Sequence, residues 1–371
     1  KVTDLLQLAA HKAANNDENF REIVLEIEKK HLDTLKQLIP VSEQSALLSH
    51  IKRIINHLET LLDGCFLLGE LSPRTADTIL SFGELLSSFI IAEALKQNLK
   101  STNYKDSREL IKTNATFGKA SVNFEVSNRL IQDYFATNDS KVVLLPGFIG
   151  ATEDGITTTL GRGGSDYSAA ILASALATEE LEIWTDVNGM YTANPKLVKQ
   201  AQPIATISYQ EAMELSHFGA KVLYPPTIQP VLRKNIPILI KNTFEPEAEG
   251  TFISNTIAAN GSPVKGISHI DNITLITLEG SGMIGVAGSS KRLFEVLSNE
   301  SINVIFITQA SSEHSICIGI LNSDAENAEI AINKAFEIEI TQNKVEPCIL
   351  EKNLCIIALV GENMKNHQGL S

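Results

Sequence analysis

The sequence predicts an α/β protein with two domains: a mainly parallel sheet with helices over residues 1–250, and ferredoxin-like units over residues 251–371. Three observations support this prediction. Short apolar strands flank a helix in the middle of the chain, a strand motif recurs near the C-terminus, and 371 residues exceed what one hydrophobic core usually supports.

The first part of the chain predicts helices. From Asp4 to Leu99 the apolar residues recur three and four positions apart, as at Leu47, Ile51 and Ile54. This spacing places them on one face of a helix. We therefore expect an amphipathic helical block at the start of the first domain.

The middle of the chain predicts a parallel crossover. The apolar runs Lys141–Leu145 and Leu181–Asp186 are typical of short strands, and each ends in turn residues, Pro146-Gly147 and Asn188-Gly189. An Ala-rich helix over Tyr167–Ala177 lies between them. Strand, helix and strand in this order predict a right-handed parallel crossover within one sheet.

The domain boundary is predicted from a change of composition. A strand over Ile236–Lys241 leads into the polar stretch Glu245–Gly250, which is rich in acidic residues, Pro and Gly. Such a stretch is typical of a connection between domains. We therefore place the boundary at residue 250.

The C-terminal part of the chain repeats itself. Asn272–Gly280 matches Asn353–Gly361 in register, and Met283 matches Met364. Two apolar strands can be alike by chance, but a shared register over a dozen positions favours duplication. Between the copies the pattern predicts a helix, two strands and a helix over residues 291–299, 303–308, 314–320 and 325–336. This order predicts a ferredoxin-like unit over about 272–350 and a second unit from about 351, truncated at Ser371.

Composition excludes several classes of partner. The formal charge is −13 and the acidic residues are spread along the chain, which argues against a nucleic-acid partner. No stretch approaches the roughly 18 uninterrupted apolar residues of a membrane-spanning helix, so we expect no membrane partner. The four cysteines lack C-x-x-C spacing and the eight histidines lack metal-ligand spacing. We therefore expect reduced cysteines in a cytoplasmic protein and no protein metal site.

The run Gly161–Asp166 is the strongest candidate for a binding site. Three glycines before a helix let backbone amides approach a ligand closely, and the helix N-terminus adds partial positive charge. A Gly-rich turn capped by Ser165 or Asp166 would need no ligand. Against that alternative, Arg162 would be a solvated charge unless it meets a carboxylate or phosphate, and the turn holds more glycines than a cap requires.

A dinucleotide-binding turn is a second alternative. Gly161 and Gly163 precede a helix, and Asp186 ends a strand at a suitable distance downstream. The pattern fails at its third glycine, where Asp166 would repel a pyrophosphate unless a metal intervened. We therefore do not favour a nicotinamide enzyme.

Five motifs follow one another along the chain: Ser81–Glu84, Gly161–Asp166, Ile183–Val187, Tyr191-Thr192 with Pro195, and Phe218–Leu223. In content, order and spacing they resemble the aspartokinases, amino acid kinases with C-terminal ACT regulatory domains. The chain is closest to the threonine-sensitive type that is commonly fused to homoserine dehydrogenase. The resemblance implies an amino-acid-kinase three-layer sandwich with a mainly parallel sheet, followed by βαββαβ ACT units.

The resemblance implies an aspartate kinase, which transfers the γ-phosphate of ATP to the β-carboxylate of L-aspartate in the first step of lysine, threonine and methionine biosynthesis. Glu84 would pair with the substrate ammonium, and Arg162 would bind its α-carboxylate. Ser165 and Thr3 would add hydroxyl hydrogen bonds. Asp166 would sit at the transfer site and orient cationic groups there, because the substrate carboxylate is already ionised at neutral pH.

The resemblance also implies an ATP site at the strand ends. Mg²⁺ would bind through the phosphates, without a dedicated protein cage. Lys196 stands where the family often has Arg. A lysine keeps the positive charge for a phosphate but cannot make the two-point contact of an arginine. Ordinary core packing is the alternative for Trp184. The implied ATP-binding residues are Trp184, Thr185, Asp186, Tyr191, Lys196, Lys221 and Val222.

One family motif is absent from this sequence. Aspartokinases open with a strand and a Lys-Phe-Gly-Gly-Thr-Ser motif whose lysine stabilises the transferred phosphoryl group. Lys1 is not that lysine, because Lys1–Leu6 resembles the segment after the family's second strand. We expect the first strand and glycine loop to be missing upstream, and this polypeptide alone to be catalytically impaired.

The C-terminal units resemble amino-acid-sensing ACT domains. Ile305–Glu313 is closest to the threonine-sensitive branch, which implies that Gln309 helps to hold threonine, in preference to lysine, at an ACT pairing surface. A plain polar strand end is the alternative. ACT sheets that pair edge to edge imply a homodimer or a higher homo-oligomer. A non-catalytic sensor that keeps a kinase fold is the competing functional class, although such a sensor has no reason to keep both binding sites.

Overall fold

The computed structural model describes residues 1–217, 222–255, 264–283, 288–309, 314–361 and 364. The chain forms two compact units, each described here by itself. The first comprises Lys1–Met190, Ala205–Met213 and Val222–Ala258, and the second Tyr191–Ile204, Glu214–Lys221 and Ala259–Ser371. The first unit therefore ends near the predicted boundary at residue 250, but two short segments from before that boundary belong to the second unit.

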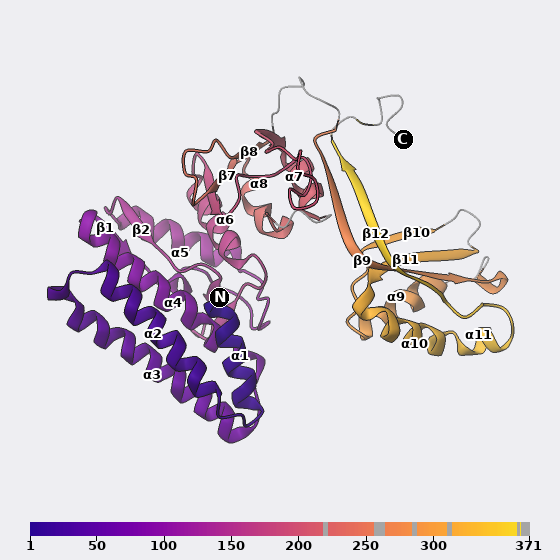
Figure 1. The fold of residues 1–371 in the computed structure, drawn as a ribbon, viewed down its shortest axis with the longest axis horizontal. Coiled ribbons are helices and arrows are strands. Elements are labelled where there is room, and N and C mark those ends of the chain that lie inside the picture. The colour runs from indigo at the N-terminus through magenta and orange to yellow at the C-terminus, as the bar shows by residue number, and fades with distance from the viewer. Residues whose placement is uncertain (218–221, 256–263, 284–287, 310–313, 362–363, 365–371) are drawn as a thin grey trace. The chain divides into compact units, whose positions relative to one another are not determined.

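Four long helices open the first unit, as the apolar spacing predicts (Figure 1). Ser72 caps α4 by accepting a hydrogen bond from the Thr75 N–H at 3.1 Å, and Pro73 occupies the first helical turn. Gly69 ends α3 in a left-handed conformation. The helices are α1 (Val2–Ala14), α2 (Phe20–Leu38), α3 (Gln44–Leu68) and α4 (Pro73–Asn98).

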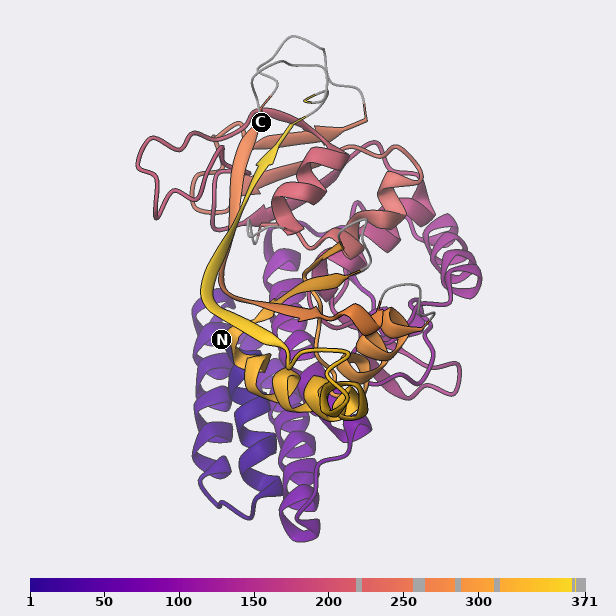
Figure 2. The same cartoon turned by 90° about the vertical axis from the view of Figure 1, so that its right-hand side faces the viewer.

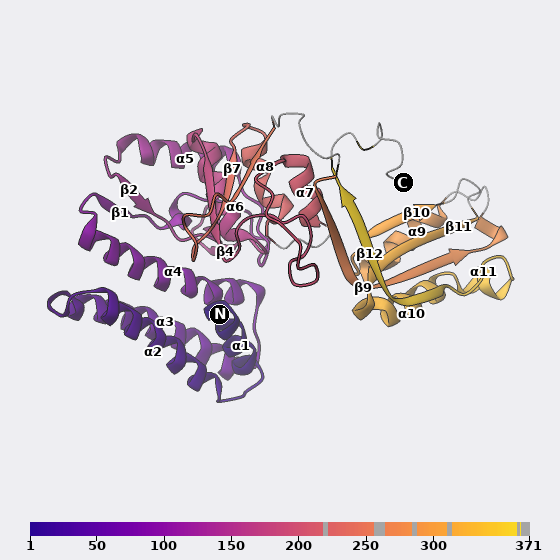
Figure 3. The ribbon, with the colours of Figure 1, turned by 45° about the horizontal axis from the view of Figure 1, so that its top comes forward.

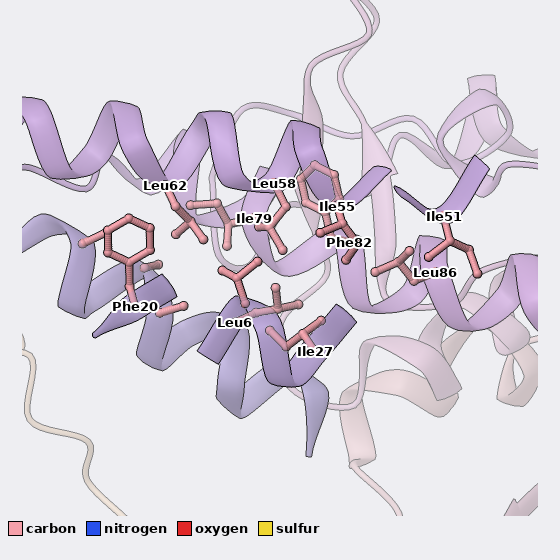
Figure 4. Close-up of a cluster of buried hydrophobic side chains, with 14 of the residues drawn as sticks. Leu6, Phe20, Ile27, Ile51, Ile55, Leu58, Leu62, Ile79, Phe82 and Leu86 are labelled. Carbon is pink, nitrogen blue, oxygen red and sulfur yellow. The ribbon is translucent and has the colours of Figure 1, made fainter. Parts of the chain in front are cut away.

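The apolar faces of these helices form one core (Figure 4). Figure 3 shows α2 and α3 running alongside α4. By length and composition alone α4 is apolar enough to cross a membrane. In the structure, its residues Ile79, Phe82 and Leu86 are buried in the core that α1, α2 and α3 share, as in the core helix of a globular domain.

The strands of the first unit form separate hydrogen-bonded sheets. Their parallel pairs agree with the predicted α/β fold. Strands β1 (Thr102–Tyr104) and β2 (Val142–Leu144) pair in parallel, joined by a connection that contains α5 (Phe124–Thr137). Strands β5 (Leu181–Thr185) and β7 (Ile238–Asn242) also pair in parallel.

Two short strands complete the part that contains β5 and β7. Strand β8 (Thr251–Ser254) pairs antiparallel with β7 and in parallel with β6 (Thr206–Ser208), which gives the order β5-β7-β8-β6. The helices α7 (Tyr209–His217) and α8 (Gln229–Leu232) and the 3₁₀ turn η3 (Pro225–Ile228) lie between β6 and β7 in the chain.

The predicted crossover from β2 to β5 is wrong in its pairing. Within the described residues β2 pairs with β1, and β5 pairs with β7. An antiparallel hairpin of β3 (Ile149–Ala151) and β4 (Thr157–Thr159) stands between β2 and α6 (Gly164–Leu176). Chain order alone does not determine which strands are neighbours, because successive strands pair only about two-thirds of the time.

The second unit holds the predicted ferredoxin-like order. The strands form an antiparallel sheet in the order β10-β11-β9-β12, with α9 and α10 packed against it (Figure 2). The shared core contains Ile276 of β9, Leu293 of α9 and Ile332 of α10. The elements are β9 (Gly266–Glu279), α9 (Ser289–Asn299), β10 (Phe306–Gln309), β11 (Ser315–Leu321), α10 (Ala325–Ala335), α11 (Glu337–Thr341) and β12 (Ile349–Val360).

The two copies of the predicted repeat lie at the ends of β9 and β12, two strands that pair antiparallel, but of the copies themselves only Leu354 and Ile273 are in register. At equivalent positions, Asn272 and Asn353 both have left-handed backbone, with φ of 59° and 62°. Asn tolerates this conformation better than most residues, so both copies contain the same local irregularity. Strand β12 therefore supplies the fourth strand of the first ferredoxin-like sheet, within the second compact unit. Beyond Gly361, Met364 alone of the second copy lies within the described residues.

Candidate active site

The turn before α6 leaves the N-terminus of that helix uncapped by side chains. Gly163 is the N-cap residue, with φ of 69°, and makes no side-chain cap hydrogen bond. The Gly164 N–H donates to the Gly161 carbonyl at 3.0 Å, which closes the turn. The alternative in which Ser165 or Asp166 caps the helix is therefore wrong. The next amides of α6, those of Ser165 and Asp166, remain available, with the positive end of the helix dipole, to bind an anion.

Packing explains why this turn needs its glycines. A Cβ atom on Gly164 would lie 2.7 Å from Cδ2 of Phe148, and one on Gly163 would lie 2.9 Å from Cβ of Tyr224. Gly163 also has a left-handed backbone, which glycine adopts at no steric cost. The glycines therefore seat the turn against its neighbours as well as leaving its amides open.

Arg162 projects from this turn as an exposed side chain. Its guanidinium carbon lies 5.7 Å from the centroid of the Tyr224 ring, within cation–π range. No carboxylate pairs with it among the residues that the structure describes. The guanidinium is thus free to bind a carboxylate in two-point geometry.

Ser165 and Asp166 follow in the first turn of α6. Ser165 is exposed beside Gly147, where an added Cβ would lie 3.2 Å from the Ser165 hydroxyl oxygen. Asp166 is partly buried, and burial raises the pKa of its carboxyl above the usual value. The turn thus presents a hydroxyl, a carboxyl and a guanidinium at one helix N-terminus.

Glu84 lies on α4, in the part of the first unit that also holds α1. Its side chain is partly buried, and desolvation raises the pKa of its carboxyl. Within the described part of the chain, no donor is recorded for this carboxylate. A Cβ on the neighbouring Gly83 would lie 3.6 Å from Cγ1 of Val2, so the start of α1 with the exposed Thr3 lies close to Glu84 in the fold.

Asp77 is a residue of this region that the sequence analysis missed. It lies on α4 seven residues before Glu84 and is only 1% exposed. Its carboxylate accepts hydrogen bonds from the Thr159 N–H and hydroxyl, both at 2.8 Å. The available signal was a charged residue among the apolar positions of a core helix, which requires buried hydrogen-bond donors.

Trp184 points away from the core of the first unit. It is 45% exposed, its Nε1–H donates to Glu182 at 2.8 Å, and the Lys241 amine lies 4.9 Å from its ring centroid. The alternative of ordinary core packing is therefore wrong. Burial alternates along β5, so Leu181 and Ile183 face the core instead.

The carboxyl ends of β5 and β7 form a polar edge. The Thr243 N–H donates to the Thr185 carbonyl at 2.8 Å, and Thr185 Oγ1 donates to exposed Asp186 at 3.3 Å. Ligands of α/β proteins bind at this edge of a parallel sheet.

A further hydrogen-bond network at this edge was not predicted. The side-chain amide of Asn242 donates to the Asn188 carbonyl oxygen, and the amide of Asn188 donates to Glu245 at 2.8 Å. The sequence predicts Asn188 only as a turn residue. Neither residue type nor spacing revealed that the two side chains meet.

The other predicted ATP-binding residues are divided between the units. Val222 is partly buried in the first unit. Tyr191 and Lys196 belong to the second unit, where Tyr191 bridges to Pro203 and the Lys196 N–H donates to the Asn194 side chain. Lys221 lies outside the described residues. A common nucleotide site for these residues remains a prediction.

Gln309 is the last residue of β10, an edge strand of the ferredoxin-like sheet. Its side chain is exposed, and its backbone is in register with Ile316 of β11. The other side of β10 carries no strand among the described residues, so Gln309 lies at an open sheet edge.

Two further observations concern possible metal ligands and a separate cavity. Among the described residues, no group of three or more His, Cys, Asp or Glu side chains could hold a metal ion. A cavity of about 590 Å³ between α3, α4 and η2 (Ser107–Glu109) is lined by His50, Arg53 and Phe89 among others. Ser81 and Phe82 of the Ser81–Glu84 motif line it, but Glu84 and the other predicted site residues do not.

The sequence matches two known families. Residues 2–242 match the amino acid kinase family, and residues 276–336 match the ACT domain. The chain is 34% identical to the chloroplastic bifunctional aspartokinase/homoserine dehydrogenase 1 of Arabidopsis thaliana and covers 41% of that protein, with all of this chain aligned. It is 33% identical to lysine-sensitive aspartokinase 3 of Escherichia coli, over 86% of this chain and 70% of that protein. The chain therefore spans less than half of the bifunctional relatives.

Solved structures agree with these matches. The fold is similar to that of E. coli aspartokinase III in complex with aspartate and ADP, with a TM-score of 0.82, 29% identity, and coverage of 100% of this chain and 80% of that one. It is also similar to the same enzyme in complex with lysine and aspartate, with a TM-score of 0.76, 30% identity, and coverage of 97% and 78%.

Proposed function

Because the chain belongs to the amino acid kinase family and resembles its aspartokinases throughout, we propose that it is the kinase part of an aspartokinase. In this proposal the protein transfers the γ-phosphate of ATP to the β-carboxylate of L-aspartate and forms 4-phospho-L-aspartate. The observation that carries the proposal is the pair of unpartnered charges, Arg162 and Glu84, within the described part of one compact unit.

The two charges match the two ends of an α-amino acid. The Arg162 guanidinium binds the α-carboxylate by a two-point contact, and the Glu84 carboxylate binds the α-ammonium. Thr3 and Ser165 add hydroxyl hydrogen bonds. When the α-carboxylate and the α-ammonium are both held, the β-carboxylate is left free to face the phosphoryl donor. Binding of the substrate thus also orients its reacting group.

The N-terminus of α6 fits the charge that develops during transfer. Its uncapped amides and the dipole of a 13-residue helix stabilise negative charge near Ser165. Asp166, whose pKa is raised by burial, orients cationic groups at this position. The substrate carboxylate is already ionised, so no protein base is required.

The carboxyl edge of β5 and β7 fits the nucleotide. Asp186 and Thr185 lie where parallel strands end, and exposed Trp184 offers an aromatic edge. Val222, in the same compact unit, completes the site in this proposal. ATP supplies the phosphoryl group when bound, and in this proposal Mg²⁺ is carried by its phosphates.

For regulation, we propose that the ACT unit binds an amino acid effector, threonine in preference to lysine, at the open edge of β10. Gln309 offers both a donor and an acceptor at that edge. Pairing of this edge with a second copy of the chain would form a homodimer and place the effector at the subunit interface. Effector binding would then shift the kinase toward a less competent state.

ATP binding separates this proposal from a non-catalytic sensor. A kinase binds ATP and aspartate and releases phosphoaspartate, whereas a sensor binds an amino acid without turnover. Calorimetric titration of the full-length protein with ATP, followed by an assay for the acyl phosphate, discriminates the two. Amino acid binding with no ATP binding would contradict the proposed function.

A further inference from the structure

Asp77 is a buried carboxylate held entirely by neutral donors. The Gly118 N–H lies 3.0 Å from each of its oxygens, and the Thr159 N–H and hydroxyl each lie 2.8 Å away. No cation pairs with it in the described part of the molecule. A buried charge without an ion pair is costly unless several hydrogen bonds stabilise it, so this arrangement is a specific one.

Both donor segments lead to the turn that carries Arg162. Thr159 ends β4 two residues before Gly161. The loop at Gly118 touches the turn directly, because a Cβ on Gly161 would lie 3.1 Å from the Gly118 carbonyl oxygen. The Ala120 N–H also donates to the Thr159 carbonyl at 2.9 Å, which closes a ring of hydrogen bonds around Asp77.

Asp77 also shares a helix face with Glu84. A separation of seven residues is almost two full turns, so the two side chains lie on the same side of α4, about 10.5 Å apart along its axis. The helix therefore carries one partly buried carboxylate, Glu84, and another, Asp77, that is hydrogen-bonded to the segments beside the Arg162 turn.

We propose that Asp77 is a positioning residue that fixes the Arg162 turn relative to Glu84 and thereby sets the orientation of the bound amino acid. The inference rests on the proposed function, because it assigns the two charges to one substrate. Asp77 does not touch the substrate. It acts through its hydrogen bonds to Gly118 and Thr159. Loss of the Asp77 side chain would weaken the binding of aspartate but leave the ends of β5 and β7 unchanged.

Two substitutions of Asp77 differ in what they preserve. Asp77→Ala removes all four hydrogen bonds. Asp77→Asn keeps the shape: its amide nitrogen can donate to the Thr159 hydroxyl, which then accepts, and its oxygen still accepts from the Gly118 and Thr159 amides. We expect Asp77→Ala to raise the KM for aspartate about tenfold or more, and Asp77→Asn only about threefold, in proportion to the hydrogen bonds lost.

A matched control removes another buried hydrogen bond of the same unit. The Ser127 hydroxyl is fully buried, accepts from the Lys112 N–H at 2.8 Å and donates to the Lys112 carbonyl at 3.3 Å. Ser127→Ala should lower Tm without changing the KM for aspartate. The KM for ATP should stay within about twofold in all three variants, since the side-chain hydrogen bonds of Asp77 and Ser127 go to Gly118, Thr159 and Lys112 and not to β5 or β7.

The test combines steady-state kinetics of the full-length protein with amide hydrogen exchange measured by mass spectrometry. We expect faster amide hydrogen exchange over residues 118–120 and 159–163 in Asp77→Ala but not in Ser127→Ala. The KM for aspartate, but not that for ATP, should rise in Asp77→Ala. Unchanged exchange in this turn, or an equal KM rise in Ser127→Ala, would overturn the inference. A wild-type protein that forms no phosphoaspartate would refute the proposed function instead, whatever the exchange data show about the turn.

Discussion

The side chain of Arg162 rests on the Tyr224 ring and is otherwise exposed, so its charge can be removed without opening the core. We expect Arg162→Ala to raise the KM for aspartate by about 10- to 100-fold, because a two-point charged contact is lost. The KM for ATP should remain nearly unchanged.

Arg162→Lys is the matched control, since it keeps the charge but not the planar fork. Steady-state kinetics with each substrate varied separately measure both constants. If Arg162→Lys has the aspartate KM of the wild type, a positive charge alone suffices at this position. If Arg162→Ala also has the wild-type KM for aspartate, Arg162 does not bind the substrate.

The Glu84 carboxyl predicts a pH dependence with a definite sign. Burial raises its pKa, so the neutral form persists to higher pH than for an exposed glutamate. Binding of the substrate ammonium needs the ionised form, so the aspartate KM should rise as pH falls through this raised pKa. Stability should change in the opposite sense: the folded state binds the proton more tightly, so the contribution of Glu84 to stability falls as pH rises through the same range.

Glu84→Gln supplies the control for this prediction. It removes the titrating group, so its aspartate KM should be high and should lack the pH dependence due to Glu84, leaving only the titration of aspartate itself. A pH profile of kcat/KM for wild type and variant tests this. Parallel profiles for the two proteins would exclude Glu84 as the ammonium-binding group.

At the scale of elements, the turn before α6 is constrained by packing. An added methyl at Gly164 would meet Phe148 at 2.7 Å, so we expect Gly164→Ala to lower the free energy of unfolding by about 1–3 kcal/mol. Gly64 is the control: it lies inside α3 with no atom within 4 Å of an added Cβ, and Gly64→Ala should stabilise by about 0.5–1 kcal/mol.

Denaturant unfolding monitored by circular dichroism measures both changes. A Gly164→Ala variant as stable as wild type would mean that the Phe148 contact can relax, and the packing account of this turn would then fail.

The sequence predicts elements better than it predicts their partners. The helices of the first unit and the β9–β12 elements follow from periodicity, a local property. Pairing of β2 with β1 rather than β5 depends on contacts between distant segments, which periodicity does not contain. The same limit applies to side chains: Arg162 and Glu84 were recognised by motif, whereas the bonds of Asp77 to Gly118 and Thr159 join residues 41 and 82 positions apart.

For the whole molecule, we expect an amino acid that binds the second unit to regulate the kinase. Calorimetric titration of the full-length protein should show threonine binding, which Gln309→Ala should weaken by about tenfold through loss of side-chain hydrogen bonds. Gln309 is exposed at a strand end, so this change should leave the sheet folded. Binding of lysine alone would contradict the threonine assignment.

In the proposed function, this chain belongs to an enzyme that phosphorylates aspartate on its β-carboxylate. The most direct test incubates the full-length protein with ATP, Mg²⁺ and L-aspartate and traps the product with hydroxylamine, which converts an acyl phosphate to a hydroxamate. We predict aspartyl hydroxamate in wild type and a strong loss of it in Arg162→Ala at limiting aspartate. Binding of ATP and aspartate without any hydroxamate would contradict the account and favour a sensor.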